Sequence, residues 1–137
     1  MIKYNELKSG DYVLADFEGD IRFGEITQVN WDERQARVDT GVQEFWFSPE
    51  QLQPIPLTDL ELQRLQFQRE DQSDGRVKYK KGAFRLMLPA PNDFSAFEIW
   101  YRDEHRHIQH PIHVHELQNH FHAMTKVHLT MEAYADA

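Results

Sequence analysis

The residues best suited to chemistry in this chain are its eight histidines, the first of which is His105. Seven of them fall between His105 and His122, and His128 is the last. Neutral imidazole is a good ligand for zinc, nickel and copper, so metal binding is one candidate function. Cysteine is absent. Disulfides, iron–sulfur clusters, cysteine-based zinc sites and cysteine nucleophiles are therefore excluded.

Two arrangements of the histidines can form a metal site. If the segment around them is extended, the side chains of His113 and His115 point to the same face and can chelate one ion. If a helix begins earlier, His113, Glu116 and His120 lie at i, i+3 and i+7 on one side of it. Two histidines and a carboxylate with an open fourth position are a plausible zinc set. The candidate zinc ligands are His113, His115, Glu116 and His120.

The same cluster also has a purely structural interpretation. On a helix that starts near His115, His122 lies on the same side but about 10.5 Å further along the axis, too far for one mononuclear site. The intermediate residues Gln118 and Asn119 are poor ligands, and no His-Glu-x-x-His motif occurs. Adventitious metal binding by exposed histidines is the competing explanation for the cluster.

Two tryptophans are candidates for contact with a partner protein. Trp31 falls in a turn predicted at 30–34, where an exposed tryptophan is often the anchor of an interaction. Trp46 is the middle residue of Phe45–Phe47, so both faces of a strand receive an aromatic ring. Either face can line a peptide groove of the kind that small barrels use, and core packing is the alternative for this set.

The charge distribution limits the classes of partner. The formal net charge is -8, and residues 1–56 hold 5 Lys and Arg against 11 Asp and Glu. An acidic chain is a poor general binder of nucleic acid, because phosphate contacts need clustered cations. The one basic cluster, Arg76–Lys81, is typical of a solvated hairpin and is the only candidate for a nucleic-acid contact. No Gly-x-Ser-x-Gly or glycine-rich phosphate loop indicates an enzyme.

The first segment, residues 1–56, must position Trp31 and Trp46. It contains four or five short strands with high β-propensity, separated by turns, and ends in a helical turn with Pro49 at its first position. This pattern predicts a small SH3-like β-barrel, with a simple meander as the fallback.

The second segment, residues 57–137, is expected to be an α+β segment packed against the barrel in one compact unit. Thr58 as N-cap places Glu61 at N3, which predicts a capping box and a helix from about Asp59 to Phe67. A hairpin is predicted from Gly75 to Leu88. The fold class predicted for the whole chain is therefore α+β.

The rest of this segment must position the histidines. A strand is predicted over 94–101, and an extended stretch over 112–115. From His115 the apolar residues recur with the period of a helix, which ends near Thr125. The N-terminus has no signal-peptide pattern, and no apolar run reaches the roughly 20 residues that span a bilayer. A cytoplasmic location, with no membrane contact, is therefore expected.

Three segments together resemble a known family. They are Leu7–Val13 at the opening turn and strand, the Pro-Ile-Pro-Leu-Thr sequence Pro54–Thr58, and the Val-His-Glu-Leu-Gln-Asn sequence Val114–Asn119. In their order and spacing they resemble a group of small proteins of Bacteroidetes and their phages or prophages. This chain departs from the family pattern at Gln66, where the family has Gly, and at Leu60-Glu61, where Glu-Trp is usual.

The resemblance brings no established activity, but it bears on the histidines. Only His115 has a counterpart in the family pattern, which weakens a shared metal site. The leading hypothesis is a non-enzymatic binding or adaptor module, phage-related by the resemblance, that contacts protein through barrel loops or a sheet edge and needs no cofactor. The alternatives are a zinc-binding protein that uses the histidine cluster, and nucleic-acid binding through Arg76–Lys81.

Overall fold

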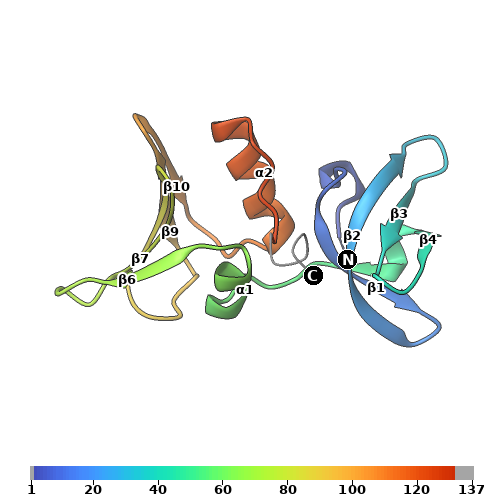
Figure 1. Cartoon of the computed structure of the whole chain (residues 1–137), viewed down its shortest axis with the longest axis horizontal. Helices are drawn as coiled ribbons and strands as arrows, with labels where there is room; N and C mark the ends of the chain where they lie inside the picture. Colours follow the sequence, from blue (N-terminus) through green and yellow to red (C-terminus); the bar gives the residue numbers. More distant parts are fainter. Residues whose placement is uncertain (1, 132–137) are drawn as a thin grey trace. The chain divides into compact units, whose positions relative to one another are not determined.

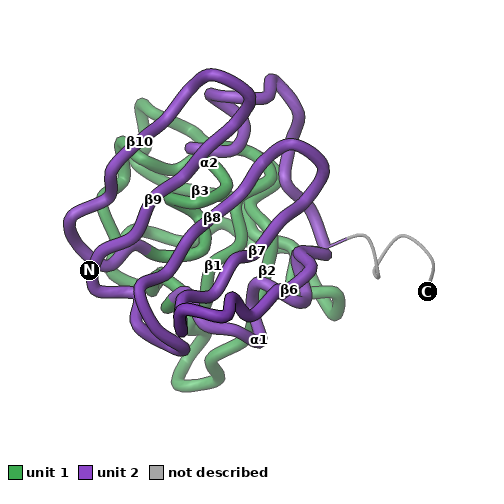
Figure 2. The backbone as a smooth tube through the Cα atoms, turned by 90° about the vertical axis from the view of Figure 1, so that its left-hand side faces the viewer, with its two compact units in different colours: residues 1–56, 113–119 green, residues 57–112, 120–137 purple. Residues whose placement is uncertain are grey.

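The computed structural model describes residues 2–131. Over this range the chain is an α+β protein with two antiparallel sheets of five strands each (Figure 1). It divides into two compact units, coloured separately in Figure 2. Unit 1 contains residues 1–56 and 113–119, and unit 2 contains residues 57–112 and 120–137. Residues 113–119 thus cluster with the first segment, whereas the sequence analysis assigns them to the second.

Unit 1 is built on a sheet with the strand order β4-β3-β2-β1-β5. Two short 3-10 turns, η1 and η2, accompany the strands. The elements are η1 (Tyr4–Glu6), β1 (Tyr12–Phe17), β2 (Asp20–Asn30), β3 (Gln35–Asp39), β4 (Glu44–Phe47), η2 (Pro49–Gln51) and β5 (Leu52–Gln53). The strands predicted in this segment are present, and Pro49 opens a helical turn as predicted.

The sheet of unit 1 does not close over the described residues, since β4 and β5 are its two edges. The predicted SH3-like barrel is therefore not confirmed, although the α+β class is. The physical reason lies at β5, which pairs with β1 only through Leu14–Gln53 and Ala15–Leu52. Closing a barrel requires a continuous ladder around the sheet, and a two-residue strand provides too few hydrogen bonds to extend it.

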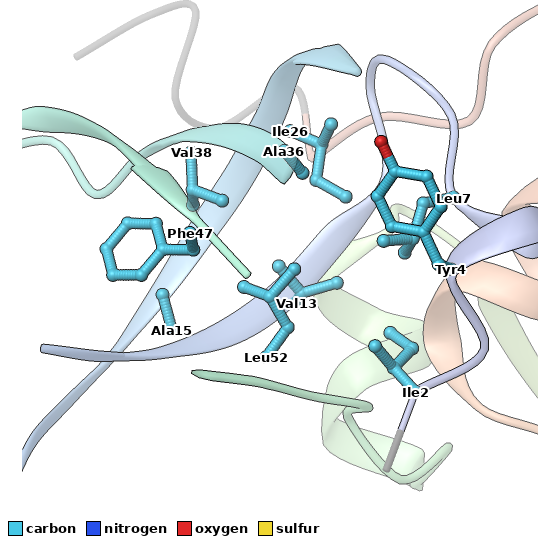
Figure 3. Close-up of a cluster of buried hydrophobic side chains, with 10 residues drawn as sticks. All are labelled: Ile2, Tyr4, Leu7, Val13, Ala15, Ile26, Ala36, Val38, Phe47 and Leu52. Carbon is cyan, nitrogen blue, oxygen red and sulfur yellow. The ribbon is translucent and has the colours of Figure 1, made fainter. Parts of the chain in front are cut away.

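Alternate residues of these strands form the core of unit 1, because successive side chains of a strand point to opposite faces. Figure 3 shows their side chains gathered between the strands and η1. The cluster comprises Ile2, Tyr4, Leu7, Val13, Ala15, Ile26, Ala36, Val38, Phe47 and Leu52. Gly24 is needed on β2, because a Cβ atom at this position would collide with the Val38 side chain.

Unit 2 contains the second sheet, in the order β10-β9-β8-β7-β6. Its elements are α1 (Asp59–Arg64), β6 (Gln68–Asp71), β7 (Val77–Lys81), β8 (Phe84–Leu88), β9 (Phe97–Tyr101) and β10 (Glu104–Ile108). The predicted hairpin is confirmed as β7 and β8, and the predicted strand at 94–101 as β9. Strands β6 and β10 were not predicted, because their residues are mostly polar and do not alternate.

One face of this sheet is apolar and buried. Phe84, the first residue of the central strand β8, contacts the rings of Phe67 and Phe121, with centroids 6.0 and 4.7 Å apart. Phe121 comes from the unit 2 part of helix α2 (Val114–Thr125), which begins and ends close to the predicted bounds. Among residues 2–131, no helix is both long and apolar enough to cross a membrane.

Helix α1 begins as the sequence predicts and ends earlier. The Thr58 hydroxyl accepts a hydrogen bond of 3.3 Å from the Glu61 N–H, which confirms the N-cap. The helix stops at Arg64 because Gln66 takes a left-handed conformation (φ 70°). The Phe67 N–H then bonds to the Leu62 carbonyl at 3.0 Å. This geometry is a C-terminal capping motif in which glycine is the preferred residue.

The cap of α1 predicts a specific stability difference. Thr58→Ala removes the oxygen that satisfies the Glu61 N–H and is expected to lower the free energy of unfolding by about 1 kcal/mol. Thr58→Ser keeps a hydroxyl at this position and is expected to retain most of the stability. Urea unfolding followed by circular dichroism measures both variants. An equal loss in the two variants would contradict a capping role for the hydroxyl.

Candidate functional site

A surface groove with a volume of about 520 Å³ opens on unit 1. Three segments that are distant in sequence contribute to it: the N-terminal segment with η1, the loop between β2 and β3, and η2. Its lining consists of Ile2, Lys3, Tyr4, Asn5, Trp31, Arg34, Pro49 and Glu50. The groove therefore depends on the tertiary fold of unit 1, and it contains one of the two tryptophans that the sequence analysis singles out.

The aromatic wall of the groove is held by interactions inside unit 1. The single proton of the buried Tyr4 hydroxyl is shared between two carbonyl acceptors, that of Gln35, at 2.9 Å, and that of Asn30. These two carbonyls lie at the facing ends of β2 and β3, so the phenol ring has a defined position. The Trp31 ring meets Tyr4 in an edge-to-face contact, with centroids 5.1 Å apart and planes at 84°. Trp31 remains 55% exposed.

The turn that carries Trp31 is ordered by local hydrogen bonds. The Asn30 side chain accepts a bond of 3.1 Å from the Glu33 N–H. Arg34 then adopts a left-handed conformation (φ 52°), which returns the chain to β3. Its guanidinium lies over the Tyr4 ring, 5.6 Å from the centroid, in a cation–π contact. The groove therefore presents a preformed aromatic surface with a cation fixed beside it.

The charges around the groove have opposite signs. Lys3 and Arg34 are positive, and Glu50 is negative. The pKa of Glu50 lies below its usual value, because its own backbone N–H and the Ser48 hydroxyl bond to the carboxylate. Glu50 therefore stays ionised in mildly acidic solution. Beyond the groove, residues 1–56 carry a net charge of -6, since 5 cationic side chains stand against 11 acidic ones.

Trp46 does not line this groove. It lies on β4 opposite Arg37 of β3, on the face of the sheet that points away from the core. The Arg37 guanidinium is 5.9 Å from its ring centroid and pairs with Glu44 at 2.7 Å. Trp46 is 39% exposed. The two predicted protein-binding residues thus occupy different surfaces of unit 1.

Of the eight residues that line the groove, the sequence analysis singled out only Trp31 and missed the other seven, among them Tyr4, Arg34 and Pro49. Tyr4 belongs to a three-residue 3-10 turn, which has no periodic pattern, and Arg34 and Pro49 resemble ordinary loop residues. Only the pairing of β2 with β3 brings the Trp31 turn beside the N-terminus. An aromatic residue close to the N-terminus was the one available signal.

The predicted metal ligands His113 and Glu116 interact with each other at the start of α2. The His113 N–H donates to Glu116 Oε1 at 2.9 Å, and His113 Nδ1 is 2.6 Å from the same oxygen. This is the return half of a capping box, in which the third helical residue caps the N-terminus. Burial raises the pKa of Glu116, but the hydrogen bonds from His113 outweigh burial and leave the pKa lowered.

The other two predicted ligands have different neighbours. His115 is 1% exposed, and its Nε2 is 3.6 Å from Glu6 Oε2. Burial lowers the pKa of His115. His120 Nδ1 is 2.8 Å from a guanidinium nitrogen of Arg106. No set of three or more histidine or carboxylate side chains within residues 2–131 is placed to hold a metal ion. The zinc site stays a prediction.

The basic hairpin Arg76–Lys81 is largely neutralised by neighbours in unit 2. Arg76 pairs with Asp74 at 2.8 Å. Lys78 and Lys80 both pair with Glu70, at 3.5 and 2.6 Å. A nucleic-acid contact through this hairpin alone would have to compete with these ion pairs. That hypothesis also stays a prediction.

Hydrogen bonds of buried polar side chains connect residues 113–119 with the N-terminal part of unit 1, and this region is called the junction below. The Gln118 side chain accepts a hydrogen bond from the Tyr12 N–H at 2.8 Å and donates one to the Gly10 carbonyl at 2.9 Å. The Asn119 side chain donates to the Glu6 carbonyl at 3.0 Å. Within residues 2–131, the buried polar or charged residues are Asp11, His115 and Gln118. All three lie in this junction.

Asp11 is the most perturbed carboxyl group of the junction. Burial raises its pKa to about 7, although the Lys8 N–H and the Asn119 side chain bond to it. The Lys8 N–H bond is 3.0 Å long. Asp11 also completes a turn in which Gly10 has a positive φ of 98°. The junction therefore holds one carboxyl and one histidine, Asp11 and His115, whose pKa values burial shifts in favour of the neutral form.

Comparison of the chain with protein-family models, with curated proteins and with solved structures finds no match. Its function is therefore inferred from the groove and from the charges of each unit.

The raised pKa of Asp11 predicts a pH-dependent stability. Because this pKa is about 7 in the folded chain, against an ordinary value of 3.8 for an aspartate side chain, Asp11 contributes stability at acidic pH. That contribution is lost as the pH rises from about 4 to about 7. Asp11→Asn removes it. The free energy of unfolding of the variant, relative to the unmodified chain, is expected to rise by on the order of 2–4 kcal/mol across this range.

Urea unfolding at intervals from pH 4 to pH 8 measures this difference. The lowered pKa of His115 acts with the opposite sign, since its protonation costs stability as the pH falls. Both chains contain His115, so its effect cancels in the difference. Asp32→Asn, in an exposed turn, is the matched control and is expected to give a flat difference. A flat difference for Asp11→Asn as well would show that Asp11 is not held neutral by burial.

Proposed function

We propose that this protein is a non-enzymatic binding module whose unit 1 groove holds an extended, proline-containing segment of a partner protein. The observation that carries the proposal is the preformed aromatic wall of the groove. Trp31 is fixed against the buried Tyr4, yet more than half of its surface is exposed. An aromatic ring that is ordered before binding loses little conformational entropy when a partner covers it.

The size and composition of the groove favour an extended peptide. A volume of about 520 Å³ is within the usual range for ligand sites. Polyproline II segments dock into aromatic-lined grooves, and their preformed backbone makes the entropy cost of binding small. Trp31, 55% exposed, supplies the apolar surface for proline rings, and the buried side chains of Tyr4 and Pro49 support it from below. Side-chain and backbone polar groups at the rim can bond to the peptide carbonyls.

The charge of residues 1–56 as a whole favours a basic residue in that peptide. The groove itself is lined by the cations Lys3 and Arg34 and by the exposed, ionised Glu50, which is the one lining carboxylate that can pair with a basic residue. The net charge of -6 on residues 1–56 attracts a cationic segment and raises its rate of encounter. The proposed occupant is therefore a proline-containing segment with at least one Lys or Arg next to the prolines.

We also propose that unit 1 is related to SH3-like barrels. Its strand order, in which the 3-10 turn η2 leads from β4 to a short β5 beside β1, supports this relationship. The strand β2 has eleven residues and a register shift between Ile26 and Gln28. Such an irregularity bends a strand and increases its twist, which helps a sheet to curl.

A labelled decapeptide with a proline-rich core and a terminal lysine tests the binding function by fluorescence anisotropy. Trp31→Ala is expected to weaken its affinity by about thirtyfold, corresponding to about 2 kcal/mol. Because Trp31 is half exposed, the variant is expected to keep its fold, which circular dichroism can check. Trp46→Ala is the matched control and is expected to bind like the unmodified protein.

Two further peptides define the specificity. A peptide with serine in place of proline is expected to lose binding, and one with glutamate in place of lysine is expected to bind more weakly than the lysine peptide. Equal affinity of the Trp31→Ala and Trp46→Ala variants would contradict a groove centred on Trp31. Failure of the proline peptide to bind the unmodified protein would contradict the proposed occupant.

A further inference from the structure

The outer face of the unit 2 sheet carries a row of side chains that the peptide-binding groove does not use. Residues of one parity on β8 and β9, such as Leu86 and Ile99, are buried on the inner face. The alternate residues of these strands point outward. Four of them lie opposite one another on the neighbouring strands β7, β8, β9 and β10 and form the row Lys80, Arg85, Trp100 and His105. Figure 2 views this face, and no other element of unit 2 covers β8 and β9.

Arg85 is the cation of this row that lacks a partner. Other arginines of unit 2 lie against a carboxylate, namely Arg64, Arg69, Arg76 and Arg106. Within residues 2–131, the Arg85 Nε atom is buried and has no hydrogen-bond partner. A guanidinium that no carboxylate neutralises keeps its full charge for an anionic ligand oxygen, with which arginine forms strong charge-assisted hydrogen bonds.

Trp100 and His105 form a stacking surface next to Arg85. Their rings are nearly parallel, at 9°, with centroids 4.7 Å apart. This distance matches the spacing of neighbouring strands, so the rings stand side by side across β9 and β10. His105 lies on the edge strand β10, and its side chain is 44% exposed. The outer face of its imidazole is therefore available to a further planar ring.

We propose that the row Lys80–Arg85–Trp100–His105 is a binding site for single-stranded nucleic acid. A base continues the Trp100–His105 stack, and the phosphates on one side of it meet Arg85 and Lys80. Aromatic stacking combined with cations along the backbone path is the usual mode of binding to single strands, and it tolerates many sequences. Four neighbouring strands span roughly 14 Å, which accommodates a short oligonucleotide segment.

The carboxylates on this face are held by neighbouring side chains, so a ligand anion meets Arg85 without competition. Glu70 lies between Lys78 and Lys80, at 3.5 and 2.6 Å, and a phosphate at Lys80 must compete with it. Glu98 lies between His105 and His107, at 3.5 and 3.4 Å. A peptide of acidic residues alone would supply carboxylates to Arg85 but no planar ring for the stack, so a nucleic acid fits the whole row better. The net charge of -8 disfavours a polyanion elsewhere on the chain, and phosphate contacts make binding sensitive to salt.

Fluorescence anisotropy with labelled twelve-nucleotide oligo(dT) and oligo(U), on the full-length protein in 50 mM salt, tests the site. Arg85→Gln is expected to weaken binding about tenfold, since it removes a charged phosphate contact. Lys80→Gln is expected to weaken binding by a smaller factor. Arg102→Gln, which removes the same charge from the β9–β10 turn, is the matched control and is expected to change affinity less than twofold. The phosphate contact at Arg85 predicts a slope of about -0.7 for log K against log salt, and a full second contact at Lys80, in competition with Glu70, would bring it to about -1.4.

A second readout reports on Trp100 alone. The chain has three tryptophans, so Trp31→Phe combined with Trp46→Phe leaves Trp100 as the only one. Oligonucleotide binding is expected to quench the fluorescence of this variant. Because the variant also removes the tryptophan of the groove, this result is independent of whether the groove binds a proline-containing peptide.

Several results would overturn the proposal. They are an absence of binding at 50 mM salt, equal losses in Arg85→Gln and Arg102→Gln, and competition by poly-glutamate as effective as that by unlabelled oligonucleotide at equal charge. The last result would show that the row binds polyanions in general and does not select nucleic acid. If circular dichroism shows that Arg85→Gln does not fold, Lys80→Gln is compared with Arg102→Gln in its place, because Lys80 is partly exposed.

Discussion

The fold of unit 1 depends on the hydrogen bonds of one side chain, the Gln118 amide. The start of β1 is buried, and its backbone groups at Gly10 and Tyr12 are both bonded to this amide, at 2.9 and 2.8 Å. A buried peptide group without a partner costs free energy comparable to a lost hydrogen bond. The partner comes from more than a hundred residues further along the chain, which explains why residues 113–119 belong to unit 1.

This junction joins three segments that are distant in the sequence, Leu7–Val13, Pro54–Thr58 and Val114–Asn119. Gln118 contacts the first segment, and the Val114 N–H bonds to the Ile55 carbonyl of the second at 2.9 Å. These contacts bring distant backbone together, and no residue of the three segments lines the groove. The three segments therefore contribute to packing, whereas the groove and the outer row are formed by residues outside them.

The groove of unit 1 and the outer row of unit 2 are built by the same principle. In each, an aromatic ring is held by one neighbour inside its unit and keeps a second surface exposed: Trp31 against Tyr4, and His105 against Trp100. The surrounding charge then selects the partner. Residues 1–56 are strongly acidic, whereas the row in unit 2 contains an arginine without a carboxylate. One small chain can in this way offer two chemically different surfaces.

The amino-acid sequence by itself determined the elements whose hydrogen bonds join residues that are close in the sequence. These include the Thr58 cap, the β7–β8 hairpin and the end of α2 near Thr125, because capping, turn and periodic patterns act locally. Polar strands such as β10 have no such pattern and were not predicted. The sequence also did not predict that the sheet of unit 1 ends at β5 without closing into a barrel. Tertiary structure alone decided that Trp31 and not Trp46 joins the groove, that Glu116 caps its own helix, and that Arg85 has no carboxylate. Each of these outcomes depends on which distant segments pair, and pairing is set by the burial of whole faces rather than by neighbouring residues.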